Sequence, residues 1–215
     1  MMNLLRKEFK LSVMAFNYIS FLFVVMMLIP NYPLYVLFFY PTIGFYQIFA
    51  NGRTNNDILF TSLLPVRKGD IVRARCLTIA ILEVIEIALA VPFAFLRSML
   101  YAGTPIEKSV FTEPNVAFFG IAFVMYALFN AMFIPAFYKT GYKIKYLWPC
   151  LGFFFFTLVA ESLAFIPATA GYIDAVDKAG QLAQLPVLIG GIVLFVTINA
   201  LVCRCSVKNF EKVNL

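Results

Sequence analysis

Six long apolar stretches constrain this chain more than any other feature of its sequence. They lie at about residues 14–30, 34–50, 76–96, 116–138, 146–166 and 185–203. A helix of about 20 residues, rising about 1.5 Å per residue, crosses the hydrocarbon core of a bilayer, which is about 30 Å thick. Because lipid offers no partner to backbone amides, and no stretch alternates like a barrel strand, we predict an all-α polytopic membrane protein, one transmembrane domain over residues 1–215.

The amino-acid composition excludes a water-soluble domain. Of the 215 residues, 62% are apolar and only 13% are charged, and the mean hydropathy is +0.88. Soluble domains carry about 25% charged residues. The first apolar stretch lacks a small-residue cleavage site and is as long as a full span, so we interpret it as a retained helix and not as a secretory signal peptide.

The basic residues predict how the chain is oriented. When loops are assigned alternately to two sides, fourteen Lys and Arg residues fall on one side and three on the other. Cytoplasmic loops are enriched in Lys and Arg, so we expect the richer side, with both termini, to be cytoplasmic. The net charge of +6 then reflects topology, and no clustered basic domain supports a nucleic-acid partner. The richer side has Arg6, Lys7, Lys10, Arg53, Arg67, Lys68, Arg73, Arg75, Lys139, Lys143, Lys145, Arg204, Lys208 and Lys212, and the poorer side has Arg97, Lys108 and Lys178.

The sequence lacks the chemistry that most membrane enzymes need. It has no histidine, which excludes His-based triads and His-containing zinc sites, and no Gly-x-x-x-x-Gly-Lys-Ser/Thr motif for nucleotide phosphates. The four cysteines lie at predicted cytoplasmic ends of spans, where thiols stay reduced, and Cys203 with Cys205 makes a poor metal site. We therefore predict no catalytic residue, metal or cofactor in this chain.

The segment from residue 52 to residue 75 is the longest predicted cytoplasmic loop. Asn55 or Asn56 can cap a helix, Asp57 suits the positive end of its dipole, and Pro65 ends it. A short, markedly apolar helix outside the membrane needs lipid headgroups or a protein groove to bury its side chains. The apolar residues of this helix are Ile58, Leu59, Phe60, Leu63 and Leu64.

The segment before the first span has the pattern of a short amphipathic helix. Its apolar residues recur at helical spacing and its basic residues occupy other faces, which indicates a helix lying at the lipid headgroups. An alternative is that the segment simply continues the first span into the cytosol. The apolar positions are Leu5, Phe9, Val13 and Phe16, and the basic positions are Arg6, Lys7 and Lys10.

Three acidic residues lie inside predicted spans. Glu83 and Glu86 share one helix face in the third span, and Glu161 lies in the fifth, nearer its outer end. Because a carboxylate in lipid is unfavourable, these side chains should face protein or water. One hypothesis is that they line a polar path or attract a cationic substrate. The other is that they hydrogen-bond to neighbouring helices or are protonated, with Glu161 a solvated or hydrogen-bonded rim residue.

The six spans, the amphipathic N-terminal helix and the helix-bearing loop resemble the small permease subunits of type-2 ABC exporters, especially a compact Bacillota group. Most of the resemblance lies in the loop, which reads Asn56-Asp-Ile-Leu-Phe-Thr-Ser-Leu-Leu-Pro-Val-Arg-Lys-Gly-Asp-Ile-Val-Arg-Ala-Arg75. Its Leu-Pro step, its arginine and the following acidic residue, Ile-Val and basic residue are similar to that group's pattern. The opening Leu4-Leu-Arg-Lys-Glu-Phe-Lys10 is similar too. Directly before Arg67, this chain has Val66 where members of that group often have Ser or Thr.

The resemblance implies a half-transporter in the bacterial plasma membrane. Two copies, or this chain and a paralogue, would form a twelve-helix unit, and a separate ATP-binding subunit would hold the ATP and Mg²⁺. The cargo implied is an amphipathic peptide, such as a phenol-soluble modulin, a lantibiotic or another antimicrobial peptide. The implied docking residues for the ATP-binding subunit are Asn56, Asp57, Leu59, Phe60, Leu63, Leu64 and Arg67.

Two other functions are compatible with the residues. An ion-coupled secondary transporter would use Glu83, Glu86 and Glu161 and would need no ATP. A membrane scaffold or immunity protein would need no polar path and should tolerate replacement of Glu83 and Glu86 by glutamine. No inverted repeat is evident, which disfavours the secondary transporter.

Overall fold

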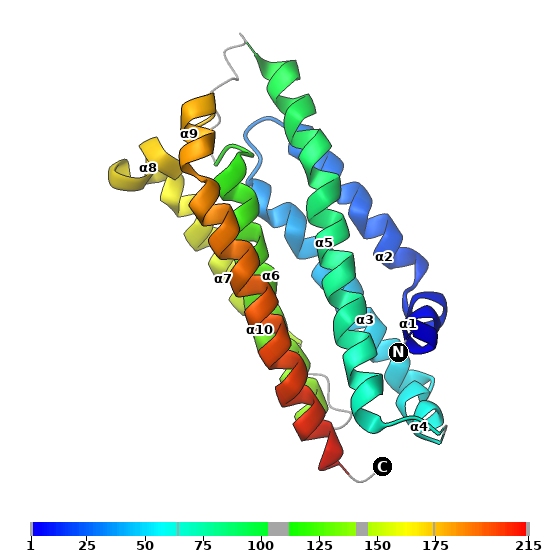
Figure 1. Ribbon diagram of the computed structural model, residues 1–215. Coiled ribbons are helices and arrows are strands. Elements are labelled where there is room, and N and C mark those ends of the chain that lie inside the picture. The colour runs from blue at the N-terminus through cyan, green and yellow to red at the C-terminus, as the bar shows by residue number, and fades with distance from the viewer. Residues whose placement is uncertain (1, 64, 103–111, 141–145, 174, 214–215) are drawn as a thin grey trace.

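In the computed structural model, the chain forms a bundle of helices (Figure 1). The structure describes residues 2–63, 65–102, 112–140, 146–173 and 175–213. Within these ranges every regular element is a helix, which confirms the all-α prediction. The elements are α1 (Met2–Lys7), η1 (Glu8–Ser12), α2 (Ala15–Ser20), η2 (Phe21–Leu28), η3 (Leu34–Phe38), α3 (Phe39–Thr54), α4 (Asp57–Ser62), α5 (Lys68–Tyr101), α6 (Val116–Thr140), α7 (Leu147–Ser162), η4 (Leu163–Phe165), α8 (Pro167–Ile173), α9 (Lys178–Ala183) and α10 (Leu185–Glu211).

Several helices are suited to crossing a membrane. Lys68–Tyr101, Val116–Thr140 and Lys178–Glu211 are long and apolar enough, and Met2–Ser12 with Ala15–Leu28 makes a fourth if this bent pair is one span. Leu147–Ser162 is a shorter apolar helix. These helices confirm a multi-pass membrane protein. All six predicted stretches lie mainly on helices, while their number as spans stays a prediction.

The chain bends sharply before the first apolar stretch. The axis of Met2–Ser12 makes an angle of 84° with that of Ala15–Leu28. Met14 has extended backbone angles, and its backbone N–H donates to Asn17 Oδ1 at 3.1 Å, so a new helix begins there. The N-terminal helix therefore does not continue straight into the first stretch, and its place at the lipid headgroups stays a prediction.

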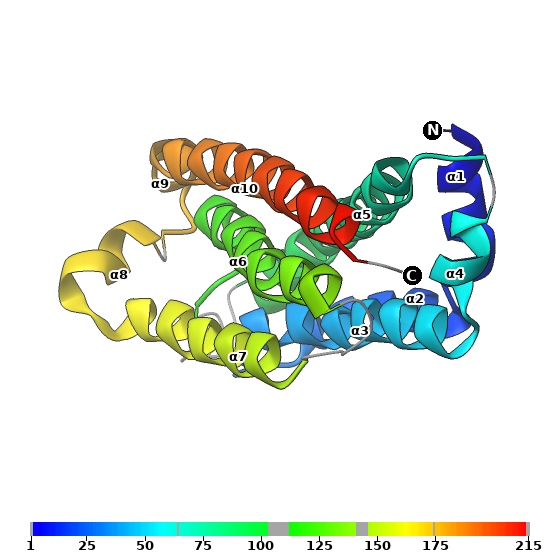
Figure 2. The same ribbon diagram turned by 90° about the horizontal axis from the view of Figure 1, so that it is seen from below.

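The two ends of the bundle differ in their elements. The N-terminal helix α1, the short helix α4, the start of α5 and the last turn of α10 lie at one end, which we call the basic end. The helices α8 and α9 lie at the opposite end (Figure 1). Seen along the bundle, α1 and α4 lie side by side at its edge (Figure 2). The basic end therefore contains the elements that the sequence assigned to the cytoplasmic side.

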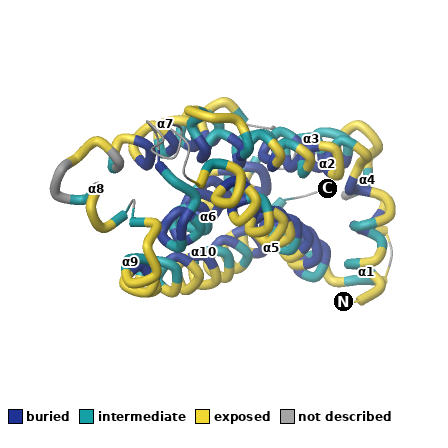
Figure 3. Tube along the Cα trace, turned by 90° about the horizontal axis from the view of Figure 1, so that it is seen from above, coloured by how far each residue is buried: buried dark blue, intermediate teal, exposed yellow. Residues whose placement is uncertain are grey.

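Two glycines allow α6 and α10 to pack closely. A Cβ added to Gly191 of α10 would lie 2.2 Å from the carbonyl oxygen of Gly120 of α6, so both glycines are needed for this approach. Gly190 faces open space instead. Buried residues line the inner faces of α5, α6 and α3, and exposed residues line the outer faces (Figure 3). The outer faces are apolar, as lipid contact requires.

The helix boundaries in the predicted loop differ in detail from the sequence pattern. The helix α4 ends at Ser62, before Leu63, and α5 begins at Lys68, well before the predicted span at residue 76. Asn56 precedes α4 in the left-handed conformation, with φ of 52°, and its side chain makes no capping hydrogen bond. Asparagine tolerates this conformation better than most residues, so Asn56 forms the turn into α4 and does not cap it.

Candidate functional site

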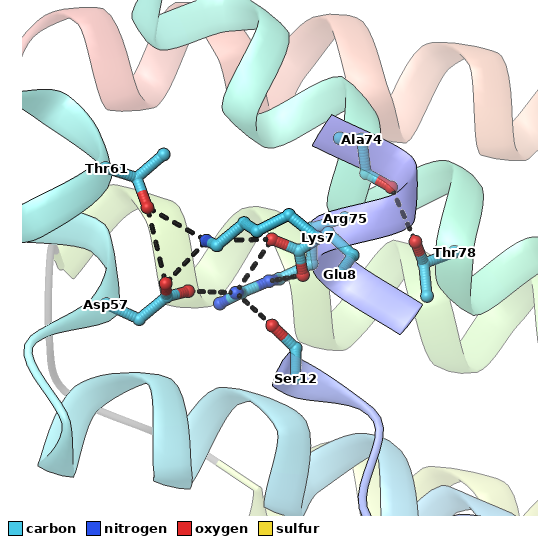
Figure 4. Close-up of polar contacts among 8 residues, drawn as sticks. All are labelled: Lys7, Glu8, Ser12, Asp57, Thr61, Ala74, Arg75 and Thr78. Carbon is cyan, nitrogen blue, oxygen red and sulfur yellow. Dashed lines mark hydrogen bonds and ion pairs between the residues drawn. The ribbon is translucent and has the colours of Figure 1, made fainter. Parts of the chain in front are cut away.

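A buried arginine joins three elements at the basic end. Arg75 of α5 is only 1% exposed, and its Nε and Nη2 donate to the two carboxylate oxygens of Glu8 at 2.9 and 3.2 Å. Nη2 also donates to Asp57 Oδ2 at 2.6 Å and to Ser12 Oγ at 3.1 Å (Figure 4). Glu8 and Ser12 belong to η1 and Asp57 begins α4. One guanidinium therefore holds η1 and α4 against α5.

A lysine completes this arrangement. Lys7 Nζ lies 2.5 Å from Asp57 Oδ1, 2.8 Å from Thr61 Oγ1 and 3.4 Å from Glu8 Oε1 (Figure 4). Two cations thus alternate with two anions, and the charges balance. Buried charges persist where they are paired and hydrogen-bonded in this way. We name this group the ionic cluster, and its residues are Lys7, Glu8, Ser12, Asp57, Thr61 and Arg75.

The ionic cluster changes the acidity of Asp57. Burial opposes ionisation of this carboxyl, but the hydrogen bond from Lys7 and the charge of Arg75 prevail and hold its pKa below the ordinary value. Asp57 is one of the predicted docking residues. The structure places its carboxylate inside the cluster, so Asp57 positions α4.

The space around Arg75 restricts what can stand there. The guanidinium carbon lies 5.7 Å from the centre of the Phe49 ring, and a Cβ added to Gly52 would lie 2.9 Å from Arg75 Nη1. Only glycine therefore fits at position 52 without movement of the arginine. A cavity of about 250 Å³ opens beside the cluster, lined by Leu11, Ser12, Asn51, Gly52, Asn55, Asp57 and Phe60.

Two apolar side chains at α4 are exposed. Phe60 is 67% exposed and Leu63, directly after the helix, is 79% exposed, whereas Thr61 is buried against Lys7. The predicted docking residues Asn56 and Arg67 are exposed as well. Leu64 lies outside the described residues, and the side chain of Leu59 is outside them too. Within the described part of the chain, Phe60 and Leu63 are thus exposed while Asp57 and Thr61 are anchored.

A second polar group lies deep between α5, α6 and α10. Asn130 Nδ2 of α6 donates to both carboxylate oxygens of Glu83 at 2.9 Å and to Asn199 Oδ1 of α10 at 3.0 Å. Glu86, one turn further along α5, accepts a hydrogen bond from the Tyr126 hydroxyl. We name these five residues the carboxyl cluster. Glu83 and Glu86 are both fully buried, so in this conformation they connect helices and face no open path.

Glu161 lies apart from the carboxyl cluster. Its two carboxylate oxygens accept from the backbone N–H groups of Tyr35 at 3.0 Å and Thr112 at 3.3 Å. Tyr35 is in the first turn of η3, and Thr112 precedes α6, so Glu161 holds two chain segments to α7. The three predicted path acids therefore do not come together. The outcome for Glu161 fits the hydrogen-bonded interpretation of this residue.

Sequence reasoning missed the partners of these acids and a second buried arginine. Arg97, near the far end of α5, donates to the carbonyl oxygens of Met27 at 2.7 Å and Ile29 at 3.0 Å, and pairs with Glu113 at 3.3 Å. These bonds satisfy backbone carbonyl groups at the C-terminal end of η2. The signal available was an arginine at the end of an apolar span. A cavity of about 440 Å³ adjoins Arg97, Tyr101, Glu113, Asn115, Phe119 and Leu188.

The fold and these clusters define a helical multi-pass membrane protein. The sequence matches the family described as ABC-2 family transporter protein over residues 3–211. The chain therefore belongs to the ABC-2 family of transporters and is a membrane component of an ABC transporter, a class that works with an ATP-binding subunit. No curated protein and no solved structure matches the chain.

Proposed function

We propose that this chain is the six-span permease subunit of an ATP-driven exporter, and that α4 is where the ATP-binding subunit docks. The observation that carries this proposal is the exposure of Phe60 and Leu63 on an element that is otherwise firmly anchored. Apolar side chains exposed on a short helix outside the membrane are typical of a surface that another protein covers. ATP and Mg²⁺ would be bound by that subunit, and hydrolysis would occur there.

The ionic cluster supports a mechanism for transmission. Arg75 binds Asp57 at the start of α4 and Glu8 of η1, and it belongs to α5, which continues for 34 residues. A displacement of α4 by the ATP-binding subunit would therefore move η1 and the first turns of α5 with it. Because α5 is one continuous helix, motion at the basic end would reach its far end, beside the cavity at Arg97.

The cargo that we propose is an amphipathic peptide, and the complete path would be formed by two permease chains. The resemblance of the loop to peptide exporters supports this cargo. The cavity near Arg97 supports it as well, since it combines apolar residues such as Val91 and Phe95 with the Arg97 and Glu113 charges. The excess of basic residues at the basic end supports cytoplasmic termini in a bacterial plasma membrane.

The docking proposal is tested with the ATP-binding subunit encoded nearest to this chain. The two proteins are co-expressed and purified in nanodiscs through a tag on the permease. We expect the wild type to retain the ATP-binding subunit and stimulate its ATPase activity. The double variant Phe60→Asp with Leu63→Asp should lose at least about tenfold in affinity, because two apolar anchors are removed.

A matched control replaces two exposed apolar residues at the opposite end, Val176→Asp with Leu182→Asp. This control variant should bind the ATP-binding subunit like the wild type. If the α4 variant binds as tightly as the control variant, docking on α4 is refuted. If the wild type itself retains no ATP-binding subunit, the exporter proposal fails with it.

A further inference from the structure

The carboxyl cluster has no cation to balance its acids. In the part of the chain that the structure describes, neither Glu83 nor Glu86 forms an ion pair, and their hydrogen-bond partners are the neutral side chains of Asn130 and Tyr126. Both carboxyls are fully buried at the centre of the bundle. An isolated ionised carboxylate in such an environment is strongly unfavourable, and two of them are more so.

Counting donors and acceptors shows what the carboxyl cluster lacks. The two N–H groups of the Asn130 amide face three oxygens, namely both of Glu83 and Oδ1 of Asn199. The single proton of the Tyr126 hydroxyl faces two, on Glu86 and on the Phe38 carbonyl. Three protons thus serve five oxygens. Among the described residues, Glu86 Oε1 and Asn130 Oδ1 are also buried without a partner. The cluster is short of hydrogen-bond donors.

We propose that Glu83 and Glu86 form a proton-binding site in which each carboxyl carries one proton while α5 is packed against α6 and α10. A proton on Glu86 lets this carboxyl donate to the Tyr126 oxygen and frees the phenol proton for the Phe38 carbonyl. A proton on Glu83 turns one of its two oxygens from an acceptor into a donor. The two N–H groups of the Asn130 amide can then donate to the other Glu83 oxygen and to Asn199 Oδ1.

The geometry favours a proton over a metal cation. Both oxygens of Glu83 face the amide nitrogen of Asn130 at 2.9 Å, and this donor group occupies the position that a cation would need. Among the described residues, the other titratable side chain that contacts Glu83 or Glu86 is Tyr126 of α6. The helix α10 contributes the neutral Asn199. The missing donors are therefore supplied by protons on the carboxyls themselves.

This site links helix packing to pH. If α5 moves away from α6 and α10 and water reaches the carboxyls, they ionise and release their protons. The packed state then holds more protons than the separated state, so its share falls as pH rises. For each bound proton, one pH unit changes the equilibrium between the two states about tenfold. The proton site does not depend on the identity of any ATP-binding subunit.

Infrared spectroscopy of the full chain in nanodiscs tests the proposal directly. The carbonyl band of a protonated carboxyl is distinct from the bands of a carboxylate and shifts in heavy water. We expect this band at pH 7 in the wild type, about half of it in Glu83→Gln or Glu86→Gln, and loss of it in the double variant. The matched control Glu211→Gln removes an exposed carboxyl and should keep the full band. A wild type without the band, or a double variant that retains it, overturns the proposal.

Thermal unfolding as a function of pH gives a second, independent readout. Glutamine is close in shape to a protonated carboxyl and also donates a hydrogen bond, so the double variant should fold. Between pH 6 and pH 9 we expect the wild-type midpoint to fall more steeply than that of the double variant. Equal slopes in the two proteins would contradict the proposal. Neither measurement involves an ATPase, so failure here leaves the docking proposal untouched, and the reverse holds as well.

Discussion

The ionic cluster and the carboxyl cluster both lie on α5, about 12 Å apart from Arg75 to Glu83 along the helix, yet they balance their buried acids differently. At the basic end, Glu8 and Asp57 face Arg75 and Lys7, so opposite charges compensate one another. At the centre of the bundle, Glu83 faces only neutral donors. The comparison teaches that an acid near the aqueous end can keep its charge if a cation is held beside it, whereas an acid at the centre must be neutral.

The largest effect is expected from removing the charge of Arg75. Arg75→Met keeps much of the side-chain volume but leaves the buried Glu8 with Lys7, at 3.4 Å, as its remaining cation. We expect a loss of about 3–5 kcal/mol in the free energy of unfolding. Denaturant unfolding in detergent measures it. The exposed pair of Arg73 with Asp70 provides the control, since Arg73→Met should change stability by less than about 1 kcal/mol. Similar losses in both variants would contradict the view that Arg75 is needed to balance a buried acid.

Neutralising one acid in each cluster distinguishes balance by ion pairs from balance by protonation. Glu8→Gln leaves Arg75 buried and short of negative charge, so we expect a loss of about 3 kcal/mol. Glu86→Gln keeps the packing and supplies a donor, so its effect should stay below about 1 kcal/mol. The same unfolding assay at pH 7 compares them. A larger loss for Glu86→Gln than for Glu8→Gln would invert the comparison.

A smaller effect is expected at the glycine that makes room for Arg75. Gly52→Ala places a Cβ 2.9 Å from Arg75 Nη1, and the required shift of the guanidinium should lower stability by about 1–3 kcal/mol. Gly190→Ala is the matched control in a helix with open space around it, and alanine there should be neutral or stabilising by up to about 1 kcal/mol. Thermal midpoints of the two variants suffice, and a more stable Gly52→Ala would show that Arg75 does not need this space.

The smallest effect concerns acid pH, where the two clusters should respond in opposite directions. The pKa of Asp57 is lower in the folded protein than in the unfolded chain, so its stabilisation is complete above the unfolded value, about 3.9, and is lost as pH falls through the lower folded value. Thermal midpoints measured from about pH 5 down to about pH 2 should therefore fall less steeply in Asp57→Asn than in the wild type. The carboxyl cluster destabilises the fold at high pH instead. If the midpoint of the variant falls with pH as steeply as that of the wild type, Asp57 does not contribute to the loss of stability in acid.

Part of the candidate site was predictable from local pattern. The helix in the loop was expected from Asp57 and its apolar neighbours and is present as Asp57–Ser62, and the shared face of Glu83 and Glu86 followed from their spacing. The docking surface and the cargo stay predictions. The sequence pattern placed Asp57 on that surface as a contact, because nothing local indicates that a lysine and an arginine far along the chain would bind it.

The sequence by itself determined that this chain is helical, apolar enough for a membrane and biased in charge between its two sides, since hydropathy, helix spacing and loop charge are local properties. Only the tertiary structure decided which acid is paired and which is not. Glu8 and Arg75 are 67 residues apart, and Glu83 and Asn130 are 47 apart. Whether such groups meet depends on how helices pack against one another, and in a low-dielectric interior that packing decides whether a carboxyl keeps its charge.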